Sequence, residues 1–400
     1  MHAGLETTGV IRHLLKAAVR RSKDTGFPSQ NAPARTRRLN FPLEFAVLTK
    51  DVIRQVTGAS GFLGSHIVAQ LLENGYNVRG AARGLKVSEM RKSYTKFGDR
   101  FQVICIPDVS IGHFPEAFKD VDAVIHTAAP LASRADSMVL FQGALEGTRN
   151  IVRQAQMCGI KRIVLTSSLA TVANLKGNFV EKLADMSFTD KDWYPVDKEK
   201  PLEGSTWDVY GAAKTLAEQE VWAFGEAHPD MDITTINPPF LYGPFAEGFT
   251  MPSPDYYALS TNLYIYRFLK SSSSFPVFPG YVDVRDVAKA HVLALTGPPS
   301  FSVGPKRVVI SSPHGCVFKE IINLIREKRP TLEQRINKDT PPTFSIDRLA
   351  VDFARIEEVL GFKKEEFRSI EDTILDTVDS LLAFEKHWLG QGIKIDIPDM

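Results

Sequence analysis

The chain has 400 residues, of which 44% are hydrophobic and 24% charged, and this length and composition are typical of one or two folded domains. Its 48 basic and 47 acidic side chains leave a formal net charge of +1, which argues against a nucleic acid or an anionic membrane as partner. No apolar run reaches the ~20 residues of a membrane-crossing helix. The three cysteines are odd in number and lack metal-ligand spacing, which indicates a reducing compartment and no metal site.

The first fifty residues differ in character from the rest of the chain. Up to Asn40 they contain eight Lys or Arg residues, and their only acids are Glu6 and Asp24. We predict that residues 1–50 form a basic, disordered extension of a cytoplasmic protein. The alternative is a mitochondrial transit peptide, for which an Arg-rich and acid-poor composition is also typical.

From residue 52 onward, short β-rich runs alternate with helical patterns. The predicted strands are 52–57, 76–82, 101–106, 121–129, 161–168 and 232–238. The predicted helices are 62–74, a stretch from about 87, 137–157 and 207–226. This α/β alternation predicts a doubly wound parallel sheet with helices on both faces, the Rossmann arrangement.

After the last of these strands the elements become mixed, and Pro, Gly, Tyr and Phe become frequent. We predict a first domain at 51–237, which also receives a strand and a helix from about 280–310, and a smaller α+β substrate lobe at 238–400. Asp283 is expected to cap the helix that follows it, with Asp286 as its reciprocal partner in a capping box.

A glycine-rich loop connects the first predicted strand to the first predicted helix, with its glycines spaced GxxGxxG. Glycines at such a position let the backbone turn tightly, approach a pyrophosphate and pack helix on strand. We therefore expect the phosphates of a dinucleotide at the N-terminus of this helix. The residues expected to contact them are Gly58, Ser60, Gly61, Phe62, Leu63 and Gly64.

The end of the second predicted strand indicates which dinucleotide binds. An NAD site needs an acid about 20 residues beyond the glycines to bind the ribose hydroxyls, and the segment "RGAARG" has none. It offers Arg83, with Lys86 three residues later, and a guanidinium can bind a 2′-phosphate bidentately. This predicts NADPH/NADP+ as cofactor, the competing interpretation being a solvated surface arginine.

Three polar residues form a candidate catalytic group. Tyr210 and Lys214 lie four positions apart on a predicted helix and therefore share one of its faces. A nearby ammonium favours the phenolate, so we expect it to lower the pKa of Tyr210 and make the hydroxyl a usable acid. A serine at the end of the 161–168 strand, Ser167 or Ser168, is the expected third member.

Four segments in this order carry a resemblance to one family: "TGASGFLG", "TSSLATV", "VYGAAK" and "YVDVRDVAKAH". The chain resembles the extended short-chain dehydrogenase/reductases, and within them the dihydroflavonol reductase-like branch with the fungal methylglyoxal, aldehyde and ketone reductases. The resemblance covers nearly all of residues 57–387. It implies NADPH-dependent reduction of a small-molecule aldehyde or ketone to an alcohol, by a monomer or homodimer.

The resemblance also assigns roles to single residues. The family's catalytic serine precedes a segment like "ATV", which selects Ser168, and adjacent strand residues face opposite ways, so that only one serine faces the substrate. Ser168 would bind the carbonyl oxygen, Tyr210 would protonate it, and Lys214 would tune Tyr210 and bind the nicotinamide ribose. The further cofactor contacts that the resemblance implies are Asp108 at the adenine, Thr127, Ala128 and Ala129 along the cofactor, and Pro238 at the nicotinamide.

Leu169, Trp207 and Phe240 resemble the family's substrate-facing positions, which implies a pocket for an apolar or aromatic carbonyl compound. The alternative is that these three side chains belong to the core, as large apolar residues commonly do. His126 ends a predicted strand, where packing and a backbone hydrogen bond are the expected role.

Two other functions stay open at this point. A nucleotide-sugar epimerase or dehydratase on the same fold would hold NAD tightly, and the missing acid after the second strand argues against it. A non-catalytic NADP sensor would keep the glycine loop and lose the chemistry. The presence of Ser168, Tyr210 and Lys214 together argues against a sensor.

The first predicted strand contains two residues that a central parallel strand rarely accepts. Arg54 and Gln55 interrupt its apolar run, and an arginine buried without a partner is costly. We infer that the basic N-terminal segment ends at about Gln55 and joins the family fold there, as a genuine variant or as an error in the inferred coding sequence.

Overall fold

The structure is a computed structural model that describes residues 52–130, 136–173, 187–276, 280–343 and 348–399. The predicted basic extension, residues 1–50, lies outside the described residues. A helix suited to crossing a membrane does not occur in the part of the chain that the structure describes.

Within the described residues, seven parallel strands form the central sheet. Their order is β3 (Phe101–Cys105), β2 (Asn77–Ala82), β1 (Ile53–Thr57), β4 (Val121–His126), β5 (Arg162–Thr166), β7 (Asp232–Asn237) and β10 (Lys306–Val309). One half of the sheet runs from β1 outward to β3. The next strand, β4, lies on the other side of β1, and the second half of the sheet continues from there. The predicted doubly wound sheet is confirmed, and the reversal between β1 and β4 marks where such sheets bind ligands.

Helices cover both faces of the sheet because successive strand residues point in opposite directions. In β4 and β5, Ile125 and Val164 pack on one face with α2 and α9, whereas Val124 and Ile163 pack on the other with α5 and α7. These four covering helices are α2 (Phe62–Glu73), α5 (Ser137–Met157), α7 (Thr206–Ala227) and α9 (Val284–Ala294). The shorter helical elements of this part are α3 (Lys86–Ser93), α4 (Pro115–Phe118), η1 (Thr95–Arg100) and η2 (Leu169–Thr171).

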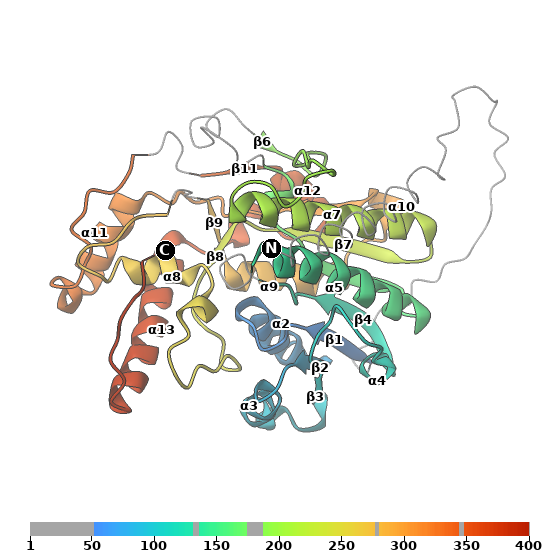
Figure 1. The fold of residues 1–400 in the computed structure, drawn as a ribbon, viewed down its shortest axis with the longest axis horizontal. Helices are drawn as coiled ribbons and strands as arrows, with labels where there is room; N and C mark the ends of the chain where they lie inside the picture. The colour runs from blue at the N-terminus through green and yellow to red at the C-terminus, as the bar shows by residue number, and fades with distance from the viewer. Residues whose placement is uncertain (1–51, 131–135, 174–186, 277–279, 344–347, 400) are drawn as a thin grey trace, which may run out of the picture.

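The remaining elements lie mainly toward the C-terminus. Two short parallel sheets pair β8 (Phe240–Tyr242) with β9 (Tyr281–Asp283), and β6 (Ser187–Phe188) with β11 (Ala350–Val351). The helices are α8 (Asn262–Arg267), α10 (Ser300–Val303), α11 (Phe318–Lys328), α12 (Phe353–Leu360) and α13 (Ile370–Gly390), with 3₁₀ turns η3 (Tyr256–Leu259), η4 (Pro330–Leu332) and η5 (Lys364–Glu366). Figure 1 shows α8, α11 and α13 together at one side of the molecule, away from the sheet.

Charged side chains tie α9 to the C-terminal helices. Asp283 caps α9 by accepting a hydrogen bond from the backbone N–H of Arg285 at 2.8 Å, as predicted. The predicted capping box is wrong, because Asp286 accepts from the backbone N–H of Arg368 at 2.9 Å and pairs with its guanidinium. With both of its oxygens engaged by Arg368, the carboxylate of Asp286 is not available to the start of α9. Arg285 in turn pairs with Asp376 of α13 at 2.6 Å.

Arg54 and Gln55 lie within β1, and both are fully buried. Arg54 has partners: its Nη1 donates to the carbonyl of Val52 at 3.0 Å and lies 3.6 Å from the carboxylate of Asp122. Its guanidinium also lies 5.0 Å from the ring centroid of Tyr76. The side-chain amide of Gln55 has no hydrogen-bond partner among the described residues. The partners of Arg54 therefore offset part of the cost of its burial, whereas the cost of burying the Gln55 amide is not offset among the described residues.

Candidate active site

The candidate site lies at the carboxyl edge of the central sheet. The residues that follow β1, β2, β4, β5 and β7 there include Gly58, Arg83, Thr127, Ser168 and Pro238. Because parallel strands all end at the same edge, the topology gathers these residues from distant parts of the sequence. Each of them was predicted from the sequence to bind cofactor or substrate.

The glycine loop is shaped for a close backbone approach. Gly58 has φ +68°, and a Cβ there would lie 2.7 Å from Oγ1 of Thr127, across the β1–β4 reversal. A Cβ on Gly64 would overlap the carbonyl oxygen of Gly58. Among the described residues no side chain caps the N-terminus of α2 at Gly61, so its first N–H groups stay available to an anion. These features fit the pyrophosphate of a dinucleotide.

Arg83 and Asp108 follow β2 and β3, and both side chains are exposed at the same edge. Hydrogen bonds from the hydroxyl of Ser110 at 2.6 Å and from its N–H at 2.8 Å hold the pKa of Asp108 below its usual range, and the charge of Arg83 adds to this effect. The structure thus places a cation at the end of β2, where an NAD site has an acid.

Ser168, Tyr210 and Lys214 meet beside this loop. Tyr210 and Lys214 lie one turn apart on α7, and Ser168 is the N-cap residue of η2. The side chain of Ser168 faces the hydroxyl of Tyr210, where it acts to lower the pKa of the phenol. The ammonium of Lys214 donates to the carbonyl of Thr166, at the end of β5, at 2.8 Å. The side chains that the sequence proposed as a catalytic group therefore form one cluster.

Burial dominates the electrostatics of this cluster. It raises the pKa of Tyr210, although the hydrogen bond from Ser168 acts in the opposite direction. Burial also lowers the pKa of Lys214 to about 8, against the charge of Glu218. We expected Lys214 to lower the pKa of Tyr210, and the direction found is the opposite. The reason is that the ammonium donates to the Thr166 carbonyl and does not offset the desolvation of the phenol.

Aromatic rings extend from Tyr210 into the C-terminal part of the chain. The ring of Trp207 is 41% exposed, and its centroid lies 5.9 Å from that of Tyr210 and 6.0 Å from that of Phe240. Phe240 stacks on Tyr264 of α8 at 5.2 Å. We call these four residues the aromatic wall. Tyr264 was missed by the sequence analysis, because no motif marks it and only the fold brings α8 to β8.

Residues 55–310 match the model of the NAD dependent epimerase/dehydratase family. The chain belongs to this family. Within it, the chain is an extended short-chain dehydrogenase/reductase, as the sequence motifs indicated.

Relatives of known activity lie within the same family. NADPH-dependent methylglyoxal reductase GRE2 of Saccharomyces cerevisiae is 28% identical over 348 residues, which cover 82% of this chain and 98% of the yeast protein. Tetraketide alpha-pyrone reductase 2 of Arabidopsis thaliana is 31% identical over 344 residues, which cover 84% of this chain and 98% of the plant protein. The crystal structure of yeast methylglyoxal/isovaleraldehyde reductase Gre2 complexed with NADPH matches with a TM-score of 0.70 at 26% identity, covering 84% of this chain and 99% of that chain.

Two residues predicted to face ligands have other contacts in this member of the family. Lys86 pairs with Glu89 at 2.9 Å and donates to Oγ1 of Thr250 at 3.1 Å, so its ammonium points to the segment after β8. Leu169 is only 3% exposed and belongs to the main hydrophobic core, which was the alternative considered for it.

His126 ends β4 and is buried. Its Nδ1 lies 2.6 Å from Oγ1 of Thr57 on the neighbouring strand, so its partner is a side chain and not the expected backbone group. Burial lowers the pKa of His126 to about 3, and the charge of Lys214 acts in the same direction. The imidazole is therefore neutral in the folded protein and serves packing.

Sequence reasoning also missed a buried ion pair behind the serine. Glu218 accepts from the hydroxyl of Ser167 at 2.6 Å and pairs with Arg307 of β10 at 2.8 Å. Ser167 thus faces Glu218, and Ser168 faces Tyr210. One signal was available, because Glu218 lies one turn beyond Lys214 on the same face of α7.

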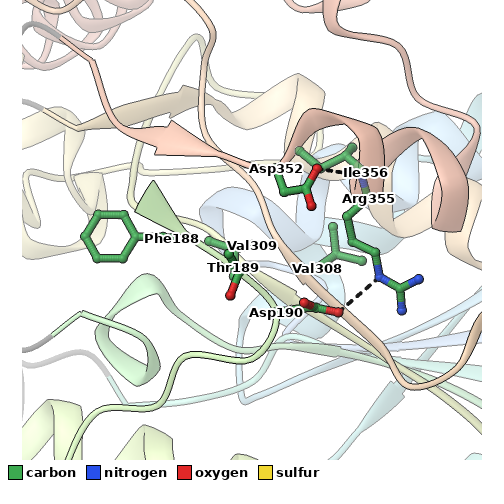
Figure 2. Close-up of a pocket in the computed structure, with 8 residues that line it drawn as sticks. All are labelled: Phe188, Thr189, Asp190, Val308, Val309, Asp352, Arg355 and Ile356. Carbon is green, nitrogen blue, oxygen red and sulfur yellow. Dashed lines mark hydrogen bonds and ion pairs between the residues drawn. The ribbon is translucent and has the colours of Figure 1, made fainter. Parts of the chain in front are cut away.

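A pocket between β6, β10 and α12 lies apart from this cluster (Figure 2). Figure 2 shows the side chain of Arg355 reaching to Asp190, and the two charges are 3.1 Å apart. Arg355 also donates to the carbonyl of Val303 at 2.8 Å. The described residues that line this pocket include none of the predicted site residues. We interpret it as a packing defect sealed by an ion pair.

Proposed function

We propose that this protein reduces an aldehyde or ketone to an alcohol with NADPH. The observation that carries the proposal is the cluster of Ser168, Tyr210 and Lys214 beside a glycine loop that fits a dinucleotide. The relatives named above are reductases, and the structure of one of them holds NADPH.

We assign a task to each hydroxyl of the cluster. When bound, NADPH supplies the hydride for the carbonyl carbon. Because Ser168 faces Tyr210, we assign both hydroxyls to the carbonyl oxygen of the substrate, to which Tyr210 delivers its proton. Lys214, 7% exposed, holds the nicotinamide ribose and supplies positive charge near the phenol as Tyr210 loses its proton.

For the cofactor, we assign the pyrophosphate to Gly58, Ser60 and the first turn of α2, from Gly61 to Gly64. Arg83 binds the 2′-phosphate, and Lys86 joins it by leaving Glu89 and Thr250. The remaining contacts that we assign to the cofactor are Asp108, Thr127, Ala128, Ala129 and Pro238. This assignment is supported by the exposed cation at the end of β2 and by the lack of room for a Cβ between Gly58 and Thr127.

The aromatic wall indicates the substrate class. Trp207 is exposed and contacts the ring of Tyr210, and the partly exposed Phe240 contacts Trp207 in turn. Aromatic rings bind flat or apolar groups well. We therefore propose an apolar or aromatic carbonyl compound as substrate, with Leu169 supporting the wall from the core.

The test is oxidation of NADPH by the full chain across a panel of methylglyoxal, aryl aldehydes, β-ketoesters and flavonoid ketones. The proposal predicts turnover of at least one member, with the aryl carbonyls ahead of methylglyoxal. NADPH binding without any turnover would support a cofactor sensor instead. Release of tightly held NAD on denaturation would support an epimerase or dehydratase.

A further inference from the structure

The buried ion pair of Glu218 and Arg307 lies directly behind the catalytic cluster. The two side chains are 0% and 3% exposed, and Nε of Arg307 donates to Oε1 of Glu218 at 2.8 Å. A buried ion pair gains little net stability, because desolvating both charges costs about as much as their attraction returns. Stability alone therefore does not explain the pair, and its hydrogen bonds indicate another purpose.

Every described contact of the Glu218 carboxylate comes from a donor. Oε2 accepts from Ser167 Oγ at 2.6 Å and from Asn237 Nδ2 at 2.8 Å, and Oε1 accepts from Thr235 Oγ1 at 2.9 Å. Burial raises the pKa of Glu218, but the charge of Arg307 and the hydrogen bonds from Ser167 and Arg307 outweigh burial and hold the pKa below its usual range. The carboxylate thus connects α7 to the carboxyl ends of β5 and β7.

Arg307 holds the opposite side of the same region. Its Nη2 donates to the carbonyl of Thr171 at 3.2 Å and to its hydroxyl at 3.0 Å. The guanidinium lies 3.7 Å from the ring centroid of Trp193, and Nη1 donates to the carbonyl of Asp190 at 3.1 Å. Figure 2 shows that the carboxylate of Asp190 is held in turn by Arg355, so the network reaches α12.

The network ends on the backbone of the catalytic serine. The hydroxyl of Thr171 accepts from Arg307 and, at 2.8 Å, from Nδ2 of Asn237. A hydroxyl has one proton and two lone pairs, so with both lone pairs used its proton must go elsewhere. It goes to the carbonyl of Ser168, at 2.9 Å. The orientation of Thr171 is thereby fixed, and with it the backbone of Ser168.

We propose that Glu218 and Arg307 are positioning residues of the reaction. Their ion pair holds the segment 166–171 against α7, so that the hydroxyl of Ser168 meets Tyr210 and the carbonyl of Thr166 meets Lys214. This inference rests on the proposed function and adds to it two residues that touch neither substrate nor cofactor.

The test compares kcat, KM and NADPH affinity in charge-balanced variants of the full chain. The double variant Glu218→Gln/Arg307→Met removes both charges and leaves no lone buried ion. Because small misplacements of catalytic groups are costly, we expect its kcat to fall about 100-fold while its dissociation constant for NADPH changes less than about threefold. Thr171→Val keeps the ion pair and removes the hydroxyl that accepts from Arg307 and Asn237 and donates to the carbonyl of Ser168. We expect its kcat to fall about tenfold.

Lys306→Met is the matched control. Lys306 precedes Arg307 on β10, is equally buried and pairs with Asp232 at 2.7 Å, but it lies at the start of its strand. Asp232 keeps Arg162 at 3.2 Å as a partner, so this variant is also charge-balanced. We expect its kcat to stay within about threefold of the wild type.

Each outcome has one meaning. If the wild type reduces a carbonyl compound, two results overturn the inference. One is an unchanged kcat in the folded double variant or in Thr171→Val. The other is a loss of kcat in Lys306→Met equal to that in the double variant. A wild type that reduces no carbonyl compound overturns the proposed function, and the inference falls with it. If the double variant does not fold, Thr171→Val alone decides.

Discussion

Ser167 and Ser168 are adjacent in the sequence, yet the structure sends their side chains to different partners. Ser168 meets Tyr210, and Ser167 meets Glu218. The alternation of side chains along a strand predicts that the two serines diverge, but it does not say what Ser167 would meet. The partner of Ser167 depends on how α7 and β10 pack together, and no local pattern in the sequence predicts that packing.

Arg83 tests the choice of cofactor at the scale of one residue. Arg83→Ala should weaken NADPH binding by about 10- to 100-fold, because a bidentate pair with a doubly charged phosphate is lost, and should leave NADH binding nearly unchanged. Titration of each nucleotide against wild type and variant measures this difference. Equal losses for NADPH and NADH would refute the 2′-phosphate assignment.

Gln55 is expected to lower the stability of the protein, because a polar side chain is unusual in the buried first strand. Its buried amide has no hydrogen-bond partner among the described residues, so Gln55→Met should raise the free energy of unfolding by about 1–3 kcal/mol. Urea unfolding of both proteins measures the change. Arg54→Met is the contrast: it removes a partnered cation near Asp122 and should destabilise the protein. A less stable Gln55→Met protein would contradict this account.

At the scale of elements, α2 depends on the close approach of Gly64 to the first glycine. Gly64→Ala should destabilise the protein by about 1–3 kcal/mol and weaken NADPH binding, because a Cβ there overlaps the carbonyl of Gly58 and pushes α2 off β1. Gly390→Ala at the end of α13 is the control, since a Cβ there has open space. Equal stability of the two variants would show that the loop adapts without cost.

The long elements were predictable from the sequence, and the short ones were not. The predicted helix 137–157 coincides with α5, because its apolar period runs over several turns and Asp136 caps its start. The strands β6 and β11 have two residues each, too few for any period to show. Asp286 was assigned to a capping box because its spacing from Asp283 fits one, whereas in the structure it pairs with Arg368 from a distant segment.

At the scale of the whole molecule, buried neutral histidines make the fold sensitive to acid. Burial lowers the pKa of His66 to about 4, of His126 to about 3 and of His291 to about 4. The unfolded chain takes up these protons near pH 6.5, well before the folded protein does, so stability falls as the pH drops below that value. At pH 5 the loss should be about 2 kcal/mol for each histidine.

Urea unfolding between pH 7 and pH 5 checks this dependence. His291→Gln should show a shallower loss of stability with falling pH, because one of the three protons is no longer taken up on unfolding. The slope is informative even if the variant is less stable at pH 7. An unchanged slope would mean that other groups set the acid sensitivity.

The topology of the sheet also explains how far the candidate site could be predicted. Loops that follow parallel strands must meet at one edge, so the glycine loop, Arg83 and the candidate catalytic residues could be placed together from the strand pattern alone. The aromatic wall could be predicted only in part. Tyr264 comes from α8, and its stacking on Phe240 depends on how the C-terminal helices pack.

The central claim is that Tyr210 donates the proton in a carbonyl reduction, and Tyr210→Phe tests it most directly. The variant keeps the ring that contacts Trp207 and removes only the hydroxyl. The account predicts that kcat with the best carbonyl substrate falls at least about 100-fold, while the dissociation constant for NADPH stays within about threefold of the wild type. Turnover equal to that of the wild type would contradict it.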